Sequence, residues 1–227
     1  MGAPKLLARW DYHPPMPGFC HTVLPLFEPG LLMVSDESVK DGAVDWPKLV
    51  WVLDNRLETK PLPIATCPLP PVKKFAKRGG RFGAHNLHEN RPVKGAWQSE
   101  RFVVGTFFNG GVRAFDLSSP FQPVEVSHAV PPAPRKSPKK AIQLNDVLVD
   151  DRGVLFTVDR MIGGMSFLVT GGARSSWGRA WFLKPRTVRH RTETGEFPRG
   201  IEGFTARRSV GGKNGCREQT QGFAFHK

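Results

Sequence analysis

The sequence predicts an all-β protein built from about three repeated four-stranded units, and three observations support this prediction. Its 24 glycines and 21 prolines make up about a fifth of the 227 residues, against roughly an eighth in average usage, which favours frequent turns over long helices. The chain also contains an internal repeat and patterns typical of β-hairpins. Repeated four-stranded units are typical of a β-propeller, whose blades surround a channel. An ordinary meander or a β-sandwich is the alternative.

The internal repeat has a period of about sixty residues. Segment 50–71 matches segment 112–132, and both have an aspartate and a proline at the same internal distance. Segment 4–10 matches the end of the same unit, so we expect the chain to start inside a repeat. In a second register, segment 101–115 aligns with segment 154–168 without a gap.

Both aligned segments of the second register have the pattern of a β-hairpin. Asn109-Gly110 between two β-rich runs predicts a type I′ turn, which needs a positive φ at both central residues. Gly163-Gly164 follows the equivalent run in the third unit.

These patterns predict the strands in order. In the first unit they are residues 21–27, 30–37, 48–55 and 61–68. In the second unit they are residues 84–90, 101–108, 111–118 and 123–130, and in the third they are residues 145–151, 153–160 and 163–170. Together with the strand near the start, they amount to about three blades, whereas propellers typically have four to eight. We therefore expect an incomplete β-propeller with open edges, through which the chain could self-associate.

The sequence after Thr170 differs from what precedes it. We expect residues 1–170 to form the partial propeller and residues 171–227 to be an irregular basic tail, either disordered or outside the evolved fold. The tail lacks period-2 alternation and holds 12 of the 33 lysines and arginines but 4 of the 20 acidic residues. Because so much of the net charge of +13 is local, it is weak support for nucleic-acid binding.

Cysteine usage and hydropathy limit the class of protein further. Three widely spaced cysteines without a CxxC pair fit neither a disulfide framework nor a cysteine zinc site. No apolar run approaches the roughly 18 residues of a membrane-spanning helix. The first residues lack the apolar region of a signal peptide, so we expect a cytoplasmic location if Met1 is the native start.

Three strings carry a family resemblance: RGGRFGAHNLHENRP, FVVGTFFNGGVRAFDLSSPFQP and AIQLNDVLVDDRGVLFTVDR. Over them the chain resembles the LVIVD-repeat proteins, a family of bacterial and archaeal β-propellers, many of them exported. The resemblance covers Pro4 to about Thr170 and implies a propeller fold. Two features depart from the family: its propellers have more blades, and its members end soon after the strand that corresponds to residues 163–170.

Polar residues occur where the first strand of each unit begins. In a propeller these points converge on the mouth of the central channel, where a ligand could bind. The candidate channel-mouth residues are His21, His85, Asn86, His88, Glu89, Asn145 and Asp146. The candidate metal ligands are His21, His85 and His88. Glu89 or Asp146 could add a carboxylate, a mixture suited to zinc, copper or iron. In the alternative interpretation, these side chains hydrogen-bond to the backbone of the neighbouring blade.

Two basic loops connect the units. The first contains Lys73, Lys74, Lys77, Arg78 and Arg81, and the second contains Arg135, Lys136, Lys139 and Lys140. Equivalent loops of a propeller emerge on one face, so both should flank the channel mouth. They indicate an anionic ligand or an acidic protein surface, or charged loops that serve solubility. Nucleic acid is less favoured, because neither loop has the interleaved aromatic residues that stack on bases.

No catalytic motif is present: the sequence lacks HExxH, GxSxG, Walker and GxGxxG patterns. We therefore expect a non-enzymatic β-propeller module that presents a basic, polar channel mouth to a protein or an anionic ligand. The alternative is a metal-dependent enzyme with a histidine cluster at the channel and a transition metal as cofactor. Neither interpretation identifies a reaction or a catalytic residue.

Overall fold

The computed structural model describes residues 3–163, 165–169 and 186–187 of the chain. Strands dominate this part, and its helical segments are the short α1 (Val72–Phe75) and η1 (Ala76–Arg78). The predicted all-β class is therefore confirmed. None of the described helices is long and apolar enough to span a membrane.

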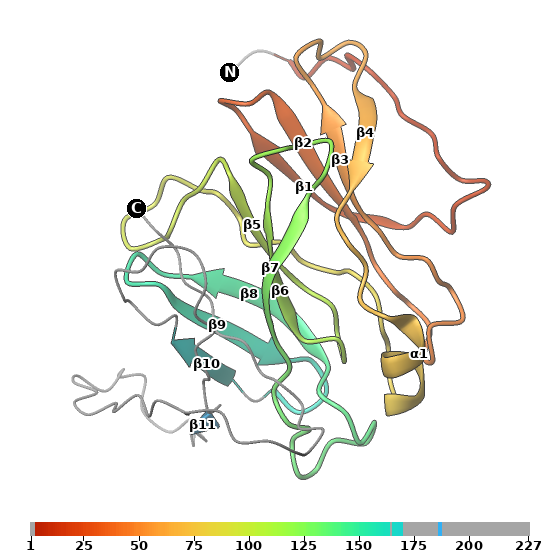
Figure 1. Cartoon of the computed structure of the whole chain (residues 1–227), viewed down its shortest axis with the longest axis vertical. Helices are drawn as coiled ribbons and strands as arrows, with labels where there is room; N and C mark the ends of the chain where they lie inside the picture. Colours follow the sequence, from red (N-terminus) through yellow and green to blue (C-terminus); the bar gives the residue numbers. More distant parts are fainter. Residues whose placement is uncertain (1–2, 164, 170–185, 188–227) are drawn as a thin grey trace, which may run out of the picture.

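The strands form three antiparallel sheets (Figure 1). The first sheet consists of β1 (Cys20–Leu26), β2 (Leu31–Asp36), β3 (Val50–Asp54) and β4 (Leu62–Thr66), in that order. The middle sheet consists of β5 (Phe102–Thr106), β6 (Val112–Asp116) and β7 (Val124–Ala129). The third sheet has the order β11-β10-β9-β8, from β8 (Leu144–Val149), β9 (Val154–Asp159), β10 (Met165–Val169) and β11 (Arg186–Thr187). Each sheet is thus a meander of sequential strands, as expected.

The middle sheet packs between the other two. One apolar cluster joins residues of β1, β2 and β3 to Val103, Phe107 and Phe115. A second cluster joins Val104 and Ala114, which lie next to these residues in β5 and β6, to residues of β8 and β9. Because neighbouring residues of a strand point to opposite faces, both faces of the middle sheet are buried, and all five residues of β6 are buried.

β-Bulges recur at equivalent places in the sheets. The β3–β4 pairing shifts between Val52 and Leu53, and the β6–β7 pairing shifts at the corresponding step of the repeat. The β1–β2 pairing shifts between Cys20 and Thr22, and the β8–β9 pairing shifts between Leu144 and Asp146. A bulge leaves one residue out of the ladder and redirects its side chain. The residues left out of the last two ladders are His21 and Asn145.

The segment predicted as a strand at 84–90 is not one, since it makes a single isolated bridge, between Leu87 and Gly105. Instead it hydrogen-bonds to several sheets. The His85 and His88 amides donate to carbonyls of β5, while the Ala84 and His85 carbonyls accept from serines in or just after β2. The His88 ring accepts from the amide of Val149 in β8. These cross-sheet bonds replace the regular ladder that the sequence predicts.

The turn between β5 and β6 also differs from the prediction. Positive φ angles occur at Phe108 (46°) and Gly111 (81°), and not at Asn109 or Gly110. The Asn109 side chain is buried and donates from Nδ2 to the carbonyl oxygens of Phe75 and Gly79, at 3.0 and 2.9 Å. The turn from Thr106 to Val112 is thus longer than a two-residue type I′ turn, and its Asn109 side chain connects it to the first basic loop.

The predicted basic tail lies almost wholly outside the described residues. Within it, the structure describes only Arg186–Thr187, which pairs with Ser166 and Phe167 of β10. The division into residues 1–170 and 171–227 stays a prediction.

Candidate functional site

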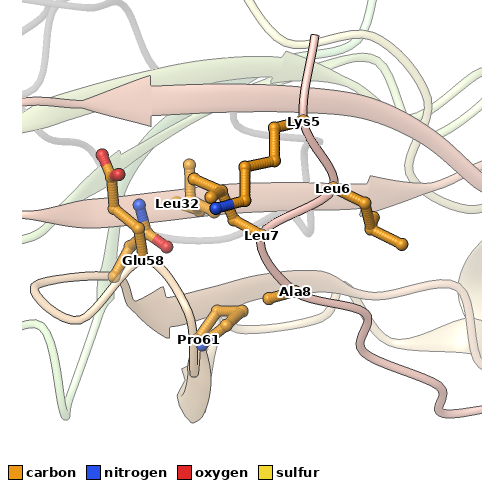
Figure 2. Close-up of a pocket in the computed structure, with 8 residues that line it drawn as sticks. Lys5, Leu6, Leu7, Ala8, Leu32, Glu58 and Pro61 are labelled. Atoms are coloured by element: carbon orange, nitrogen blue, oxygen red, sulfur yellow. The ribbon is translucent and has the colours of Figure 1, made fainter.

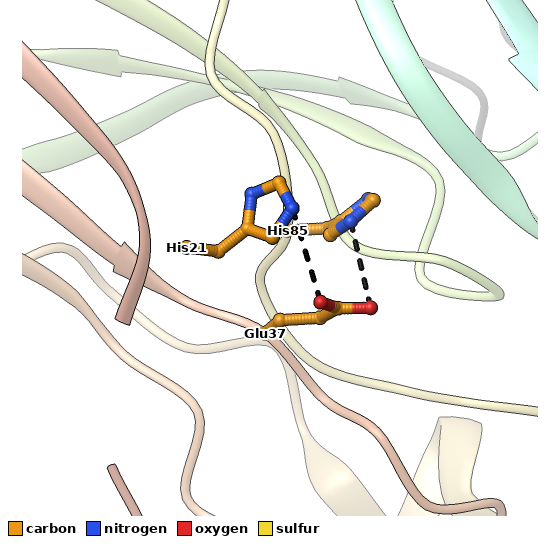
Figure 3. Close-up of side chains that lie close together, drawn as sticks. All are labelled: His21, Glu37 and His85. Atoms are coloured by element: carbon orange, nitrogen blue, oxygen red, sulfur yellow. Dashed lines mark ion pairs between the residues drawn. The ribbon is translucent and has the colours of Figure 1, made fainter. Parts of the chain in front are cut away.

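Three side chains that could hold a metal ion meet where the sheets approach one another (Figure 3). They are His21 from the bulge of β1, Glu37 directly after β2, and His85 from the segment that crosses between sheets. Their ligand atoms all lie within 4.8 Å of one another. We call these three residues the histidine–glutamate cluster. In the described part of the chain, no other group of three or more histidine, cysteine or acidic side chains has this proximity.

The imidazole of His85 is held in one tautomer. Its Nδ1 lies 2.7 Å from the Asn145 carbonyl oxygen, which can only accept a hydrogen bond, so Nδ1 carries the proton. That leaves a lone pair on Nε2, which lies 3.6 Å from Glu37 Oε1. The ring also stacks on Phe108, with 4.7 Å between ring centroids.

A chain of hydrogen bonds fixes the imidazole of His21 in the same way. The Asn86 amide donates from Nδ2 to the Asn145 carbonyl at 2.9 Å, which directs Asn86 Oδ1 towards Thr22. Thr22 donates its single hydroxyl proton to this Oδ1, so its oxygen accepts from Nδ1 of His21 at 2.9 Å. The Nε2 of His21 is then the ring nitrogen that faces Glu37, 3.8 Å from Oε2.

The bulge in β8 makes this arrangement possible. Because Asn145 is left out of the β8–β9 ladder, its carbonyl is available to accept from the His85 ring and the Asn86 amide. The bulge in β1 likewise places His21 beside the His85 ring, with 4.3 Å between centroids. The structure therefore brings His21, His85, Asn86 and Asn145 together, as the convergence of the repeated strand starts predicts.

Two arginines from different parts of the chain meet at Glu37. Arg81 Nη1 donates to Glu37 Oε1 at 2.9 Å, and Arg160 Nη1 donates to the same oxygen at 3.4 Å. Both guanidinium groups also lie over the ring of Phe108, 5.6 and 5.4 Å from its centroid. Two positive charges thus face one carboxylate, so the site is positive overall when both imidazoles are neutral.

Burial lowers the pKa of His85 to about 4, and the nearby charges of His21 and Arg160 act in the same direction. The charge of Glu37 and the hydrogen bond to Asn145 oppose this shift without cancelling it. The His85 imidazole is therefore neutral at physiological pH.

The two basic loops lie side by side next to the cluster. A Cβ at Gly79, in the first loop, would be 2.3 Å from the backbone oxygen of Lys139 in the second. Lys139 also forms an ion pair with Asp41, whose backbone bridges to Arg81. The exposed cations of the loops are Lys73, Lys74, Lys77, Arg135, Lys136 and Lys140, while Arg78 packs on the ring of Phe75.

The other candidate channel-mouth residues are not part of the cluster. His88 is buried; its Nε2 donates to the Trp97 carbonyl at 2.8 Å, and its Nδ1 accepts from the Val149 amide at 3.2 Å. Both ring nitrogens are thus bound to backbone, the arrangement expected of a structural histidine. Glu89 pairs with an arginine at the surface, and Asp146 is exposed.

Two residues of the site, Glu37 and Arg160, were missed by the sequence analysis. Glu37 could have been found from hairpin register, since Leu26 pairs with Leu31 and the ladder then sets Asp36 opposite Cys20. Glu37 follows Asp36 directly, so it lies beside the start of β1, close to His21. For Arg160 no such signal exists, because it approaches from the third sheet.

Two open depressions lie away from the histidine–glutamate cluster, and neither is lined by a predicted site residue. One, of about 380 Å³, lies between residues 5–8 and the strands of the first sheet (Figure 2). Its apolar lining includes Leu6, Leu7 and Leu32, with Lys5 and Glu58 at its sides. These depressions have no convergent polar groups comparable to the histidine–glutamate cluster.

No known protein family, curated protein or solved structure matches this chain. The geometry of the histidine–glutamate cluster is therefore the basis for assigning a function.

Proposed function

We propose that the chain is part of a β-propeller of the LVIVD-repeat kind, and that it acts as a non-enzymatic module that binds an acidic ligand beside the histidine–glutamate cluster. Support for the propeller comes from three sequential meanders that pack face to face, and from bulges at equivalent places. The site lies at the starts of β1 and β8, which are equivalent strands of the proposed blades.

The convergence of Arg81 and Arg160 on one carboxylate is the observation that supports an acidic ligand. Guanidinium groups bind carboxylates and phosphates through several donors at once. Each arginine donates to Glu37 through one nitrogen only. The side chains of Arg81 and Arg160 are 26% and 31% exposed. A ligand can therefore reach these groups from solvent. The adjoining basic loops add to the positive potential that would attract an anion.

Calorimetric titration with citrate and with a hexaglutamate peptide tests this function. Arg160→Gln removes one charge-assisted hydrogen bond, so we expect about a tenfold to hundredfold loss of affinity for the probe. The matched control is Arg152→Gln, because Arg152 pairs with Asp150 before β9, whereas Arg160 follows that strand. The control should leave the affinity unchanged.

Salt provides an independent check on the same titration. Attraction at an exposed site is screened within about 8 Å at physiological ionic strength, so the affinity should fall as salt is raised. If neither probe binds, or if Arg152→Gln and Arg160→Gln reduce binding equally, the proposed function is wrong.

A further inference from the structure

We propose that His21, Glu37 and His85 together bind one divalent first-row transition metal ion. This inference goes beyond anion binding and does not depend on it, because it rests on the histidine–glutamate cluster rather than on the two arginines. Its starting point is that both imidazole rings point a nitrogen towards the Glu37 carboxylate (Figure 3).

Three side chains of the cluster bring one potential ligand atom each to the same place, and these atoms all lie within 4.8 Å of one another. In both histidines Nδ1 donates a hydrogen bond, to Asn145 or to Thr22, so Nε2 is the ring nitrogen that is directed into the cluster. Both Nε2 atoms face the Glu37 carboxylate, at 3.6 Å for His85 and 3.8 Å for His21. These distances are too long for hydrogen bonds. Two imidazole nitrogens and one carboxylate oxygen that are directed at one point are donor atoms that a transition metal ion can join.

The spacing also fits a metal ion. Bonds of about 2.0 to 2.2 Å from zinc to nitrogen and oxygen set neighbouring ligand atoms about 3 to 3.5 Å apart. Glu37 Oε2 and His21 Nε2 are 3.8 Å apart, and all the ligand atoms lie within 4.8 Å of one another, so the side chains must move slightly closer together to bind an ion. Two imidazoles and one carboxylate suit zinc, iron, cobalt and nickel, and they leave coordination positions open for water or another ligand.

The surrounding hydrogen bonds match those of known metal sites. A metal-binding histidine almost always donates its other ring N–H to a carbonyl or another acceptor, which fixes the ring and raises its basicity. His85 does this through Asn145, and His21 does it through Thr22. Arg81 and Arg160 hold Oε1 of Glu37, which leaves Oε2 beside His21 for the metal.

The nearby arginines oppose a dication electrostatically, so the affinity should be lower than that of a closed structural zinc site. The opposition is limited because both guanidinium groups bind the oxygen that the metal does not need.

Titration of the metal-free full chain with Co²⁺ and Zn²⁺ tests the site. We expect one ion per chain, a Co²⁺ spectrum of nitrogen and oxygen ligands without thiolate absorption, and at least about a tenfold loss of affinity in His21→Ala and Glu37→Gln. His13→Ala removes an exposed histidine outside the cluster and should change nothing. Cys20→Ser should also change nothing, which excludes the neighbouring thiol as a ligand.

Thr22→Val tests the hydrogen bonds that orient the ring. It keeps all three ligands and the size of the side chain but removes the acceptor for His21 Nδ1, so the metal affinity should fall by about tenfold or more. In ¹⁵N spectra of the wild-type protein, Zn²⁺ should shift the Nε2 signals of both imidazoles, while both Nδ1 atoms stay protonated. Thermal unfolding of each variant separates loss of the site from loss of the fold.

Two results would overturn the metal site. One is Zn²⁺ binding that leaves the Nε2 signal of either imidazole unshifted, because that nitrogen is then not a ligand. The other is metal binding that His21→Ala and His13→Ala weaken equally. Neither result affects citrate binding, which depends on Arg160, so the metal site and the proposed function can fail separately.

Discussion

Replacement of Asn109 by aspartate should destabilise the protein more than truncation to alanine does. The Asn109 side chain is 1% exposed, and its two donated hydrogen bonds connect the β5–β6 turn to Phe75 and Gly79. Asn109→Asp keeps the shape but removes both donors and sets a carboxylate against two carbonyl oxygens. Each buried hydrogen bond left without a partner costs about 1 to 3 kcal/mol, so we expect the free energy of unfolding to fall by about 2 to 6 kcal/mol.

Asn109→Ala should cost less, about 2 kcal/mol, because it also removes Oδ1, a buried oxygen for which no partner exists among the described residues. Urea unfolding followed by tryptophan fluorescence measures these differences, and Asn55→Asp at a half-buried position is the control. Hydrogen exchange at residues 76–81 should also accelerate in both Asn109 variants. A smaller loss in Asn109→Asp than in Asn109→Ala would refute the reasoning.

Two further predictions concern packing and pH. Phe115 is fully buried between the first and middle sheets, so Phe115→Ala should lower the free energy of unfolding by about 3 to 5 kcal/mol, whereas Phe121→Ala, 65% exposed, should change it by less than about 0.5 kcal/mol. Equal costs in urea unfolding would contradict the packing of these sheets. Burial lowers the pKa of His88 in the folded state, although the hydrogen bond to Trp97 and the charges of Glu89 and Asp146 raise it. In the unfolded chain the imidazole is protonated near pH 6.5. The contribution of His88 to the free energy of unfolding should therefore be fully present above pH 6.5. It should fall by up to about 1.4 kcal/mol per pH unit as the pH decreases towards the folded-state pKa. The variant His88→Gln should reduce this slope. An unchanged slope between pH 7 and 5 would show that His88 does not couple pH to folding.

The sequence predicts the strands well because hydrophobic alternation and turn residues are local properties. It fails where tertiary contacts decide the local conformation. Asn109-Gly110 has the composition of a type I′ turn, yet the positive φ angles occur at Phe108 and Gly111, and the Asn109 side chain bonds to the first basic loop. Residues 84–90 have a strand-like sequence, but their hydrogen bonds go to several sheets instead of one.

The site could be predicted in part for a similar reason. The repeat places His21, His85 and Asn145 at equivalent positions, so their convergence follows from the symmetry of the units. The tautomers of the two histidines depend on Thr22 and on the bulge in β8, which leave no pattern in the sequence. Arg160 reaches Glu37 across 123 residues of chain, a contact that only the packing of the sheets defines.

The segment from Ala84 to His88 has a consequence for how the protein unfolds and how it can evolve. Repeat proteins often unfold unit by unit from their ends, because each unit contacts only its neighbours. Here one short segment bonds to all three sheets, through Ser35 and Ser38, through Val104 and Thr106, and through Asn145 and Val149. The three sheets should therefore lose their structure in one cooperative step. Insertion of a single residue in this segment would shift every following bond by about 3.3 Å, so its length is constrained far more strictly than that of the basic loops on either side.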